Sequence, residues 1–158
     1  MVLLLLLRLV HILSGIFWVG TMMFNTAFLF PAFKDAGPEG AKVGAALAKR
    51  RFMVVMPIVA LVTILSGVWL FSLVSGGFQA TFMQSHMATA LSFGAACAIV
   101  AFIIGVVVVR PAMVQATTLA QSNPQRAQVL RVRADVVGRV VTALVVLAAA
   151  AMAVARYI

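Results

Sequence analysis

The sequence predicts an all-α fold, an integral membrane four-helix bundle. Hydrophobic residues occupy 65% of the 158 positions and charged residues only 9%, whereas charged residues make up about a quarter of a typical soluble domain. The mean hydropathy is +1.17. A helix needs about 20 apolar residues to cross the roughly 30 Å hydrocarbon core of a bilayer. We therefore expect a single transmembrane domain over residues 1–158, in contact with the lipid bilayer.

Long uncharged runs predict four spans, at about residues 6–31, 53–75, 82–109 and 135–157. The run 52–109 is long enough for two of them, and the turn between these two is marked by Ser75, Gly76, Gly77, Gln79 and Thr81. The last run is short, so the fourth span is expected to begin near Asp135 and to include Arg139. These two residues can pair at i,i+4.

Prolines and polar residues predict where the helices begin and end. The apolar opening of the chain lacks a basic start and continues past Arg8 without a small-residue cleavage motif, so we expect it to belong to the first helix rather than to a signal peptide. The first and third helices are expected to end at the pairs Pro31-Ala32 and Pro111-Ala112. Asn123 and Pro124 predict the cap and first position of the last helix.

The positive charge predicts an orientation. The chain has 12 Lys and Arg against 3 Asp and Glu, a net charge of +9. The basic residues gather between spans one and two and between spans three and four: Lys34, Lys42, Lys49, Arg50, Arg51, Arg110, Arg126, Arg131 and Arg133. By the positive-inside rule these loops are cytoplasmic and both termini face outward, in a bacterial inner membrane. Anionic lipid heads explain the basic loops, so no nucleic-acid partner is expected.

The small number of acidic residues and the single cysteine limit the kinds of reaction that the chain can support. Three acidic residues leave little support for the carboxylate pairs that many hydrolases use. A single cysteine, Cys97, cannot form an intrachain disulfide and is best explained as a small core residue.

The two histidines lie in matching contexts. The segments that begin at His11 and His86 share the pattern His-x-x-(Ser/Thr)-(Gly/Ala)-aliphatic-x-aromatic. Together with the Pro-Ala pairs this predicts a duplicated helical hairpin, whose axis along the membrane normal would bring the histidines face to face. His11 precedes Pro31 by 20 residues but His86 precedes Pro111 by 25, an offset in depth of roughly 7 Å.

Facing imidazoles are the axial ligands of a b-type haem, so the leading hypothesis is one haem b held by His11 and His86. Arg8 and Arg156 would neutralise its propionates. Small and aromatic residues on the same helix faces would make room for the ring and wall it: Gly15, Trp18, Ala90, Phe93 and Gly94. Such an oxidoreductase or electron-transfer component would pass single electrons between a quinol or a redox partner protein and an acceptor on the outer side.

Two other functions fit the same residues. Met83, His86 and Met87 cluster at the outer end of span three, and thioethers with imidazole suit copper(I), so copper transport or delivery is an alternative. The histidines could also be structural, in a non-catalytic assembly subunit or an oligomer. Five residues within spans one and two are expected to form hydrogen bonds or close packing between helices: Asn25, Thr26, Thr63, Ser66 and Gly67. Ser66, Gly67 and Trp69 are expected at roughly the depth of the histidines.

The segment Leu9-Val10-His11-Ile12-Leu13-Ser14-Gly15-Ile16-Phe17-Trp18-Val19-Gly20 resembles the first helix of a group of small bacterial membrane proteins. The group comprises CopD-like copper-resistance domains, the membrane part of PuuD-type urate oxidases and HemJ-type protoporphyrinogen oxidases. The resemblance implies a four-helix bundle with a haem b or metal, His11 as the first-helix ligand and His86 as its third-helix partner. HemJ-type proteins have a lysine in the third helix, and this chain has none in any span, which argues against porphyrinogen oxidation.

Overall fold

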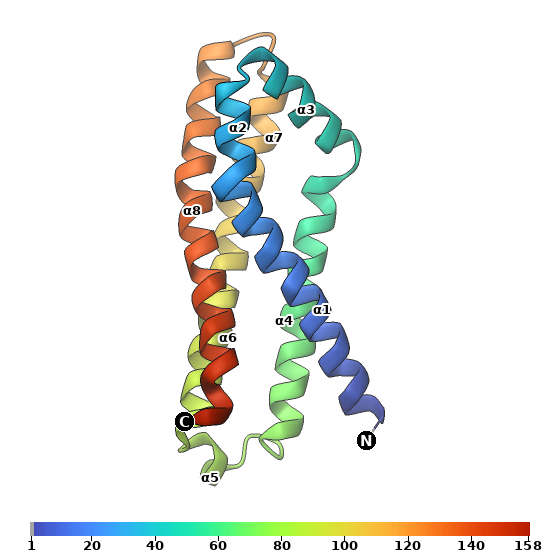
Figure 1. Cartoon of the computed structure of the whole chain (residues 1–158), viewed down its shortest axis with the longest axis vertical. Coiled ribbons are helices and arrows are strands. Elements are labelled where there is room, and N and C mark those ends of the chain that lie inside the picture. Colours follow the sequence, from blue (N-terminus) through green and yellow to red (C-terminus); the bar gives the residue numbers. More distant parts are fainter. Residues whose placement is uncertain (1) are drawn as a thin grey trace.

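The structure, a computed structural model that describes residues 2–158, contains four helical stretches that are long and apolar enough to cross a membrane. They are Val2–Asp35, Phe52–Val74, His86–Thr118 and Pro124–Tyr157. The stretches run alternately in opposite directions, so both termini lie at one end of the bundle, the terminal end (Figure 1). The opposite end is called the basic end. The predicted all-α four-helix membrane fold is confirmed.

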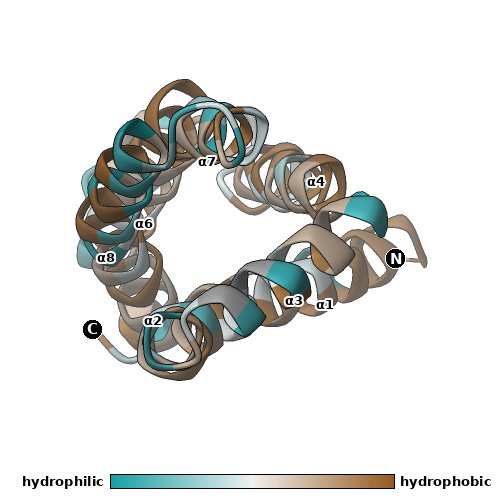
Figure 2. Cartoon of the chain, turned by 90° about the horizontal axis from the view of Figure 1, so that it is seen from above, coloured by the Kyte–Doolittle hydropathy of each residue, from teal (hydrophilic) through white to brown (hydrophobic). Residues whose placement is uncertain are grey.

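The elements follow one another without a strand in the described chain. In order they are α1 (Val2–Phe24), a π-helical turn (Asn25–Leu29), α2 (Phe30–Asp35), α3 (Pro38–Lys49), α4 (Phe52–Val74), α5 (Ala80–Met83), α6 (His86–Ile104), a second π-helical turn (Gly105–Val109), α7 (Arg110–Thr118), α8 (Pro124–Val154) and a 3-10 turn (Ala155–Tyr157). Helix α3 bridges α2 and α4 at the basic end (Figures 1 and 2).

The predicted turn and cap are confirmed. Gly76 and Gly77 have φ of 63° and 81°, a left-handed conformation in which glycine carries no side-chain penalty. Asn123 Oδ1 accepts a hydrogen bond of 3.0 Å from the Arg126 amide and so caps α8. Ser85, which the sequence analysis did not single out, caps α6 by accepting from the Ala88 amide at 3.1 Å.

The prediction that the first and third helices end at Pro-Ala pairs is wrong, because both helices continue through the prolines to Asp35 and Thr118. A proline has no amide hydrogen and its ring collides with the carbonyl four residues earlier. A π-helical turn before each pair widens the helix at that point: the Phe30 amide bonds Asn25 O, and the Arg110 amide bonds Gly105 O. The two turns are equivalent at a spacing of 80 residues, which extends the similarity between the two hairpins.

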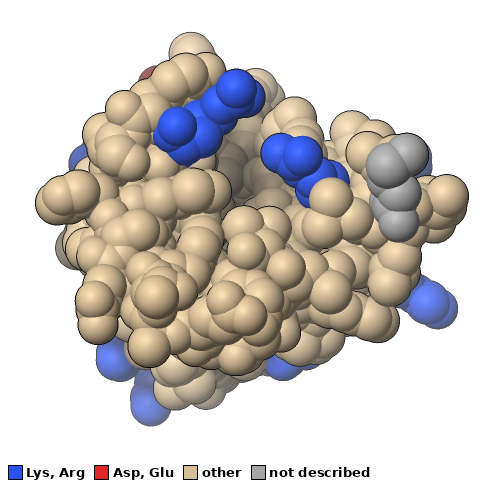
Figure 3. All heavy atoms as spheres, turned by 90° about the horizontal axis from the view of Figure 1, so that it is seen from below, with Lys and Arg blue, Asp and Glu red and all other residues tan. Residues whose placement is uncertain are grey.

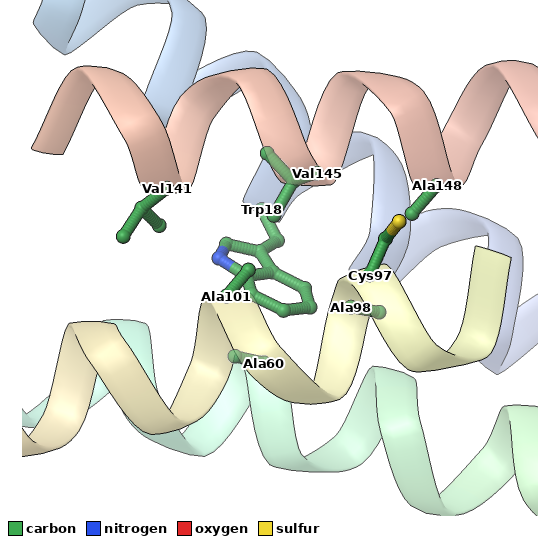
Figure 4. Close-up of a cluster of buried hydrophobic side chains, with 8 residues drawn as sticks. All are labelled: Trp18, Ala60, Cys97, Ala98, Ala101, Val141, Val145 and Ala148. Atoms are coloured by element: carbon green, nitrogen blue, oxygen red, sulfur yellow. The ribbon is translucent and has the colours of Figure 1, made fainter. Parts of the chain in front are cut away.

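The bundle packs as two closely associated pairs, α1 with α4 and α6 with α8. Its core is made of small side chains around one large one. The Trp18 indole of α1, 5% exposed, lies between α6 and α8, with Ala60 of α4 beneath it (Figure 4). Cys97 belongs to the same core, as predicted. Large apolar side chains cover the outside of the bundle, as lipid contact requires.

Polar contacts join the helices at few points. Arg139 donates to Asp135 at 2.9 Å, which confirms the predicted i,i+4 pair. Thr26 and Thr142 share a hydrogen bond of 2.7 Å between their hydroxyls, which ties α8 to the first π-helical turn.

The Thr26–Thr142 bond gives a testable stability prediction. Changing either residue to valine should destabilise the bundle, and the double mutant should show a coupling free energy of about 0.6 kcal/mol, the average for such bonds in membrane proteins. The measurement is reversible unfolding in mixed detergent micelles. Thr89→Val serves as the control partner, because the Thr89 hydroxyl bonds only its own helix at Ser85 O. A coupling energy equal to that of the control pair would contradict the prediction.

Candidate functional site

His11 is the candidate ligand with the most defined surroundings. It is the tenth residue of α1, is half-buried and points to α4. Its Nδ1 lies 2.8 Å from the carbonyl oxygen of Thr63 and 3.4 Å from Ser66 Oγ. Because a carbonyl oxygen can only accept, Nδ1 must carry the proton, and the Nε2 of the neutral ring keeps its lone pair. Within residues 2–158 no hydrogen-bond partner of Nε2 is found.

Gly67 makes this contact possible. In a helix, the side chain of a residue leans back over the turn that precedes it, so a side chain at position 67 would cover the Thr63 carbonyl. A Cβ on Gly67 would lie 2.7 Å from His11 Cε1 and 3.1 Å from Nδ1. The imidazole therefore occupies space that only glycine leaves free. The expectation that Ser66 and Gly67 lie at the depth of a histidine is confirmed, whereas Trp69 is exposed.

His86 lies elsewhere. It is the first residue of α6 and is exposed, whereas His11 is well inside α1. The expected face-to-face placement of the two imidazoles is not seen, because the His11 ring is directed to α4 and α1 pairs with α4 rather than with α6. The candidate copper ligands Met83 and Met87 flank His86: Met83 ends α5 and is exposed, and Met87 is half-buried.

The predicted space-making and wall residues have diverse positions. Gly15 packs on Thr63 of α4, and Gly94 is buried where α6 approaches α8, since a Cβ there would lie 3.0 Å from Ala148 O. Both glycines therefore serve helix packing. Trp18 is a core residue and Ala90 is half-buried. Phe93, predicted as a wall of the haem pocket, is 54% exposed and faces outward, where lipid would lie.

The two predicted propionate partners, Arg8 and Arg156, are both exposed. Arg8 lies one turn before His11 on α1, and Arg156 lies in the turn after α8, 5.0 Å above the ring of Tyr157. Figure 3 looks onto the terminal end and shows basic groups on either side of a hollow, with further basic groups at the outline of the molecule. This end could therefore receive an anionic group.

A second candidate site was not predicted. A cavity of about 140 Å³ lies among the spans on the side of Trp18 toward the basic end, and Asn25 is the one uncharged polar side chain among the described residues that line it. The sequence predicts that Asn25 bonds between helices, but among the described residues its amide has no such partner. Nothing in the sequence distinguishes Asn25 from its hydrogen-bonded neighbour Thr26.

Comparison with protein-family models, with curated proteins and with solved structures finds no match for this chain. Within the described part of the chain, no group of three or more His, Cys, Asp and Glu side chains is placed to hold a metal ion.

Proposed function

We propose that this protein is a b-type haem protein of a bacterial inner membrane that transfers single electrons, with His11 as a haem ligand. The observation that supports it is the orientation of the His11 ring. A ligating histidine typically donates its other ring N–H to a carbonyl or carboxylate, which fixes the tautomer and the ring and raises the basicity of the ligating nitrogen. His11 makes this contact with Thr63 O, and its Nε2 keeps its lone pair for a ligand.

A haem is favoured over a metal ion held by protein ligands alone. Within the described chain, no group of three or more His, Cys, Asp and Glu side chains is placed to hold a metal ion. A haem supplies four of its own ligands and needs one or two from the protein. His86 would be the second protein ligand of the haem, and Arg8 and Arg156 would pair with its propionates. Bound haem would supply a one-electron iron couple, and the chain would hold and orient it.

The membrane orientation is part of the proposal. Nine of the twelve basic residues lie at the basic end, between spans one and two or between spans three and four. Arg139 lies within α8, and Arg8 and Arg156 belong to the terminal end. By the positive-inside rule the basic end is cytoplasmic, so His11 belongs to the outer half of the membrane. In this orientation the electron acceptor would lie on the outer side, and a quinol or a partner protein would be the electron donor.

Absorbance spectroscopy of the detergent-purified protein tests the proposal. Protein expressed with haem supplied should show a Soret band when oxidised and a sharp α-band of the b type after reduction with dithionite. Metal analysis of the same sample should find iron and no stoichiometric copper. A colourless protein would contradict the proposal. If copper were bound and lost on changing Met83 and Met87 to leucine, the copper alternative would replace it.

A further inference from the structure

The cavity at the first π-helical turn carries a feature that the haem proposal does not use. Asn25 is only 4% exposed and lines the cavity. Its side-chain amide makes no hydrogen bond within residues 2–158, although its backbone oxygen accepts from the Phe30 amide. The amide atoms are open to the cavity rather than enclosed by protein, because Asp135 Oδ1 is the one enclosed side-chain nitrogen or oxygen without a partner among the described residues. Such an amide facing a cavity inside an apolar bundle is therefore placed for a ligand that completes its hydrogen bonds.

The walls around Asn25 define the shape of that ligand. Aromatic rings line the cavity from several helices, among them Trp18, Phe30 and Phe102, and four methionines add flexible thioether surface: Met22, Met53, Met56 and Met113. Flat rings pack well against such walls. The volume of about 140 Å³ is well below the roughly 300–1,000 Å³ of sites for drug-sized ligands, so it suits a single substituted ring and excludes a porphyrin.

Both hairpins build the cavity with equivalent residues. Asn25 begins the first π-helical turn and Gly105 begins the second, and both line the cavity. The residues that close these turns, Phe30 and Arg110, line it as well. π-helical turns occur frequently at functional sites. Gly105 leaves open space, because a Cβ added there would meet nothing within 4 Å.

The charges on the cavity wall favour a neutral ligand over an anionic one. Arg110 is the single cation on the cavity wall, is exposed, and donates through Nε to Met53 O at 3.1 Å. It lies five residues further toward the basic end than the position equivalent to Asn25, about 7 Å along the helix. The buried polar group of the cavity is thus a neutral amide, which can both donate to a carbonyl and accept from a hydroxyl.

We propose that this cavity binds the ring of a lipid-soluble quinone or quinol, with Asn25 hydrogen-bonded to a ring oxygen. The isoprenoid tail would extend from the cavity into the lipid, and the ring would fit without moving any core side chain. The inference does not depend on haem, because His11 does not line this cavity. It does give the quinol partner expected from the sequence a location on the side of Trp18 opposite His11.

Equilibrium binding of a tritiated short-chain ubiquinone to the purified full chain in detergent tests the proposal. Wild type should show one saturable site. Gly105→Leu, which fills the cavity, should abolish saturable binding, and Asn25→Leu, of nearly equal size, should weaken it by about tenfold or more, the equivalent of one lost hydrogen bond. Gly20→Leu is the matched control, because Gly20 is exposed on α1 and a Cβ there meets nothing within 4 Å.

Several outcomes would overturn the assignment. Equal binding by wild type and Gly105→Leu would place the quinone in the detergent or elsewhere on the protein. Undiminished binding by Asn25→Leu would remove the amide as the ring contact. Saturable binding of tritiated palmitate in place of the quinone, lost in Arg110→Gln, would assign the cavity to a fatty acid.

Circular dichroism and gel filtration check that each variant folds. Haem content, measured on the same samples, should be unchanged in Asn25→Leu and so separates this test from that of the haem.

Discussion

His11→Ala is expected to abolish haem binding, because it removes the one imidazole whose orientation is fixed by the fold. Loss of a group that merely orients a ligand typically lowers metal affinity by about 10–100-fold, so loss of the ligand itself should exceed about a hundredfold. His86→Ala should retain haem, because His86 is exposed at the first residue of α6 and no described contact positions it at His11. The His86→Ala variant should differ from wild type only by the loss of the sixth ligand of the iron, which would change from low-spin to high-spin.

The measurement is the pyridine haemochrome content per chain together with the oxidised spectrum, for wild type and both variants. Ile12→Ala is the control for a change on the same turn of α1, since Ile12 is exposed. Equal and complete haem loss in both histidine variants would show that the two ligands contribute alike, as the duplicated hairpin predicted. Full haem retention in His11→Ala would remove His11 as a ligand and leave its contact with Thr63 a structural one.

Local patterns in the sequence were sufficient for the elements of the fold. The spans, the Gly76-Gly77 turn, the Asn123 cap and the Asp135–Arg139 pair each depend on a few neighbouring residues, and each is seen in the structure. The neighbourhood of Ser66 and Gly67 with His11 could be predicted because antiparallel spans of known length fix the depth of each residue.

Which side chains point into the bundle and which point toward lipid could not be predicted in the same way. A membrane helix is apolar on all sides, since lipid is as apolar as the core, so hydrophobic periodicity does not mark its inner face. Hence Phe93 was assigned to the interior although it faces outward. The direction of His11 depends on which helix α1 pairs with. The π-helical turns, which allow Pro31 and Pro111 inside continuous helices and bring Asn25 to the cavity, likewise have no recognised pattern in the sequence.

Gly67→Ala tests the contact that orients His11. The added Cβ would lie 2.7 Å from His11 Cε1, closer than side chains approach, so the ring must move and the bond from Nδ1 to Thr63 O must lengthen or break. Overpacking of this kind typically costs about 1–3 kcal/mol. We expect a loss of that size in the free energy of unfolding in mixed micelles, with a lower haem content. Gly20→Ala should change neither, since its Cβ meets nothing within 4 Å.

A double mutant separates this steric effect from a general weakening of the contact between α1 and α4. In the His11→Ala background the imidazole is absent, and the methyl group of Gly67→Ala occupies space that the ring has vacated. The two changes should therefore be strongly non-additive, with the double mutant at least as stable as His11→Ala alone. Additive losses would mean that alanine at position 67 disturbs the helix pair through something other than the ring. In that case Gly67 would serve helix packing, as Gly94 does between α6 and α8, and the orientation of His11 would depend on the Thr63 carbonyl alone.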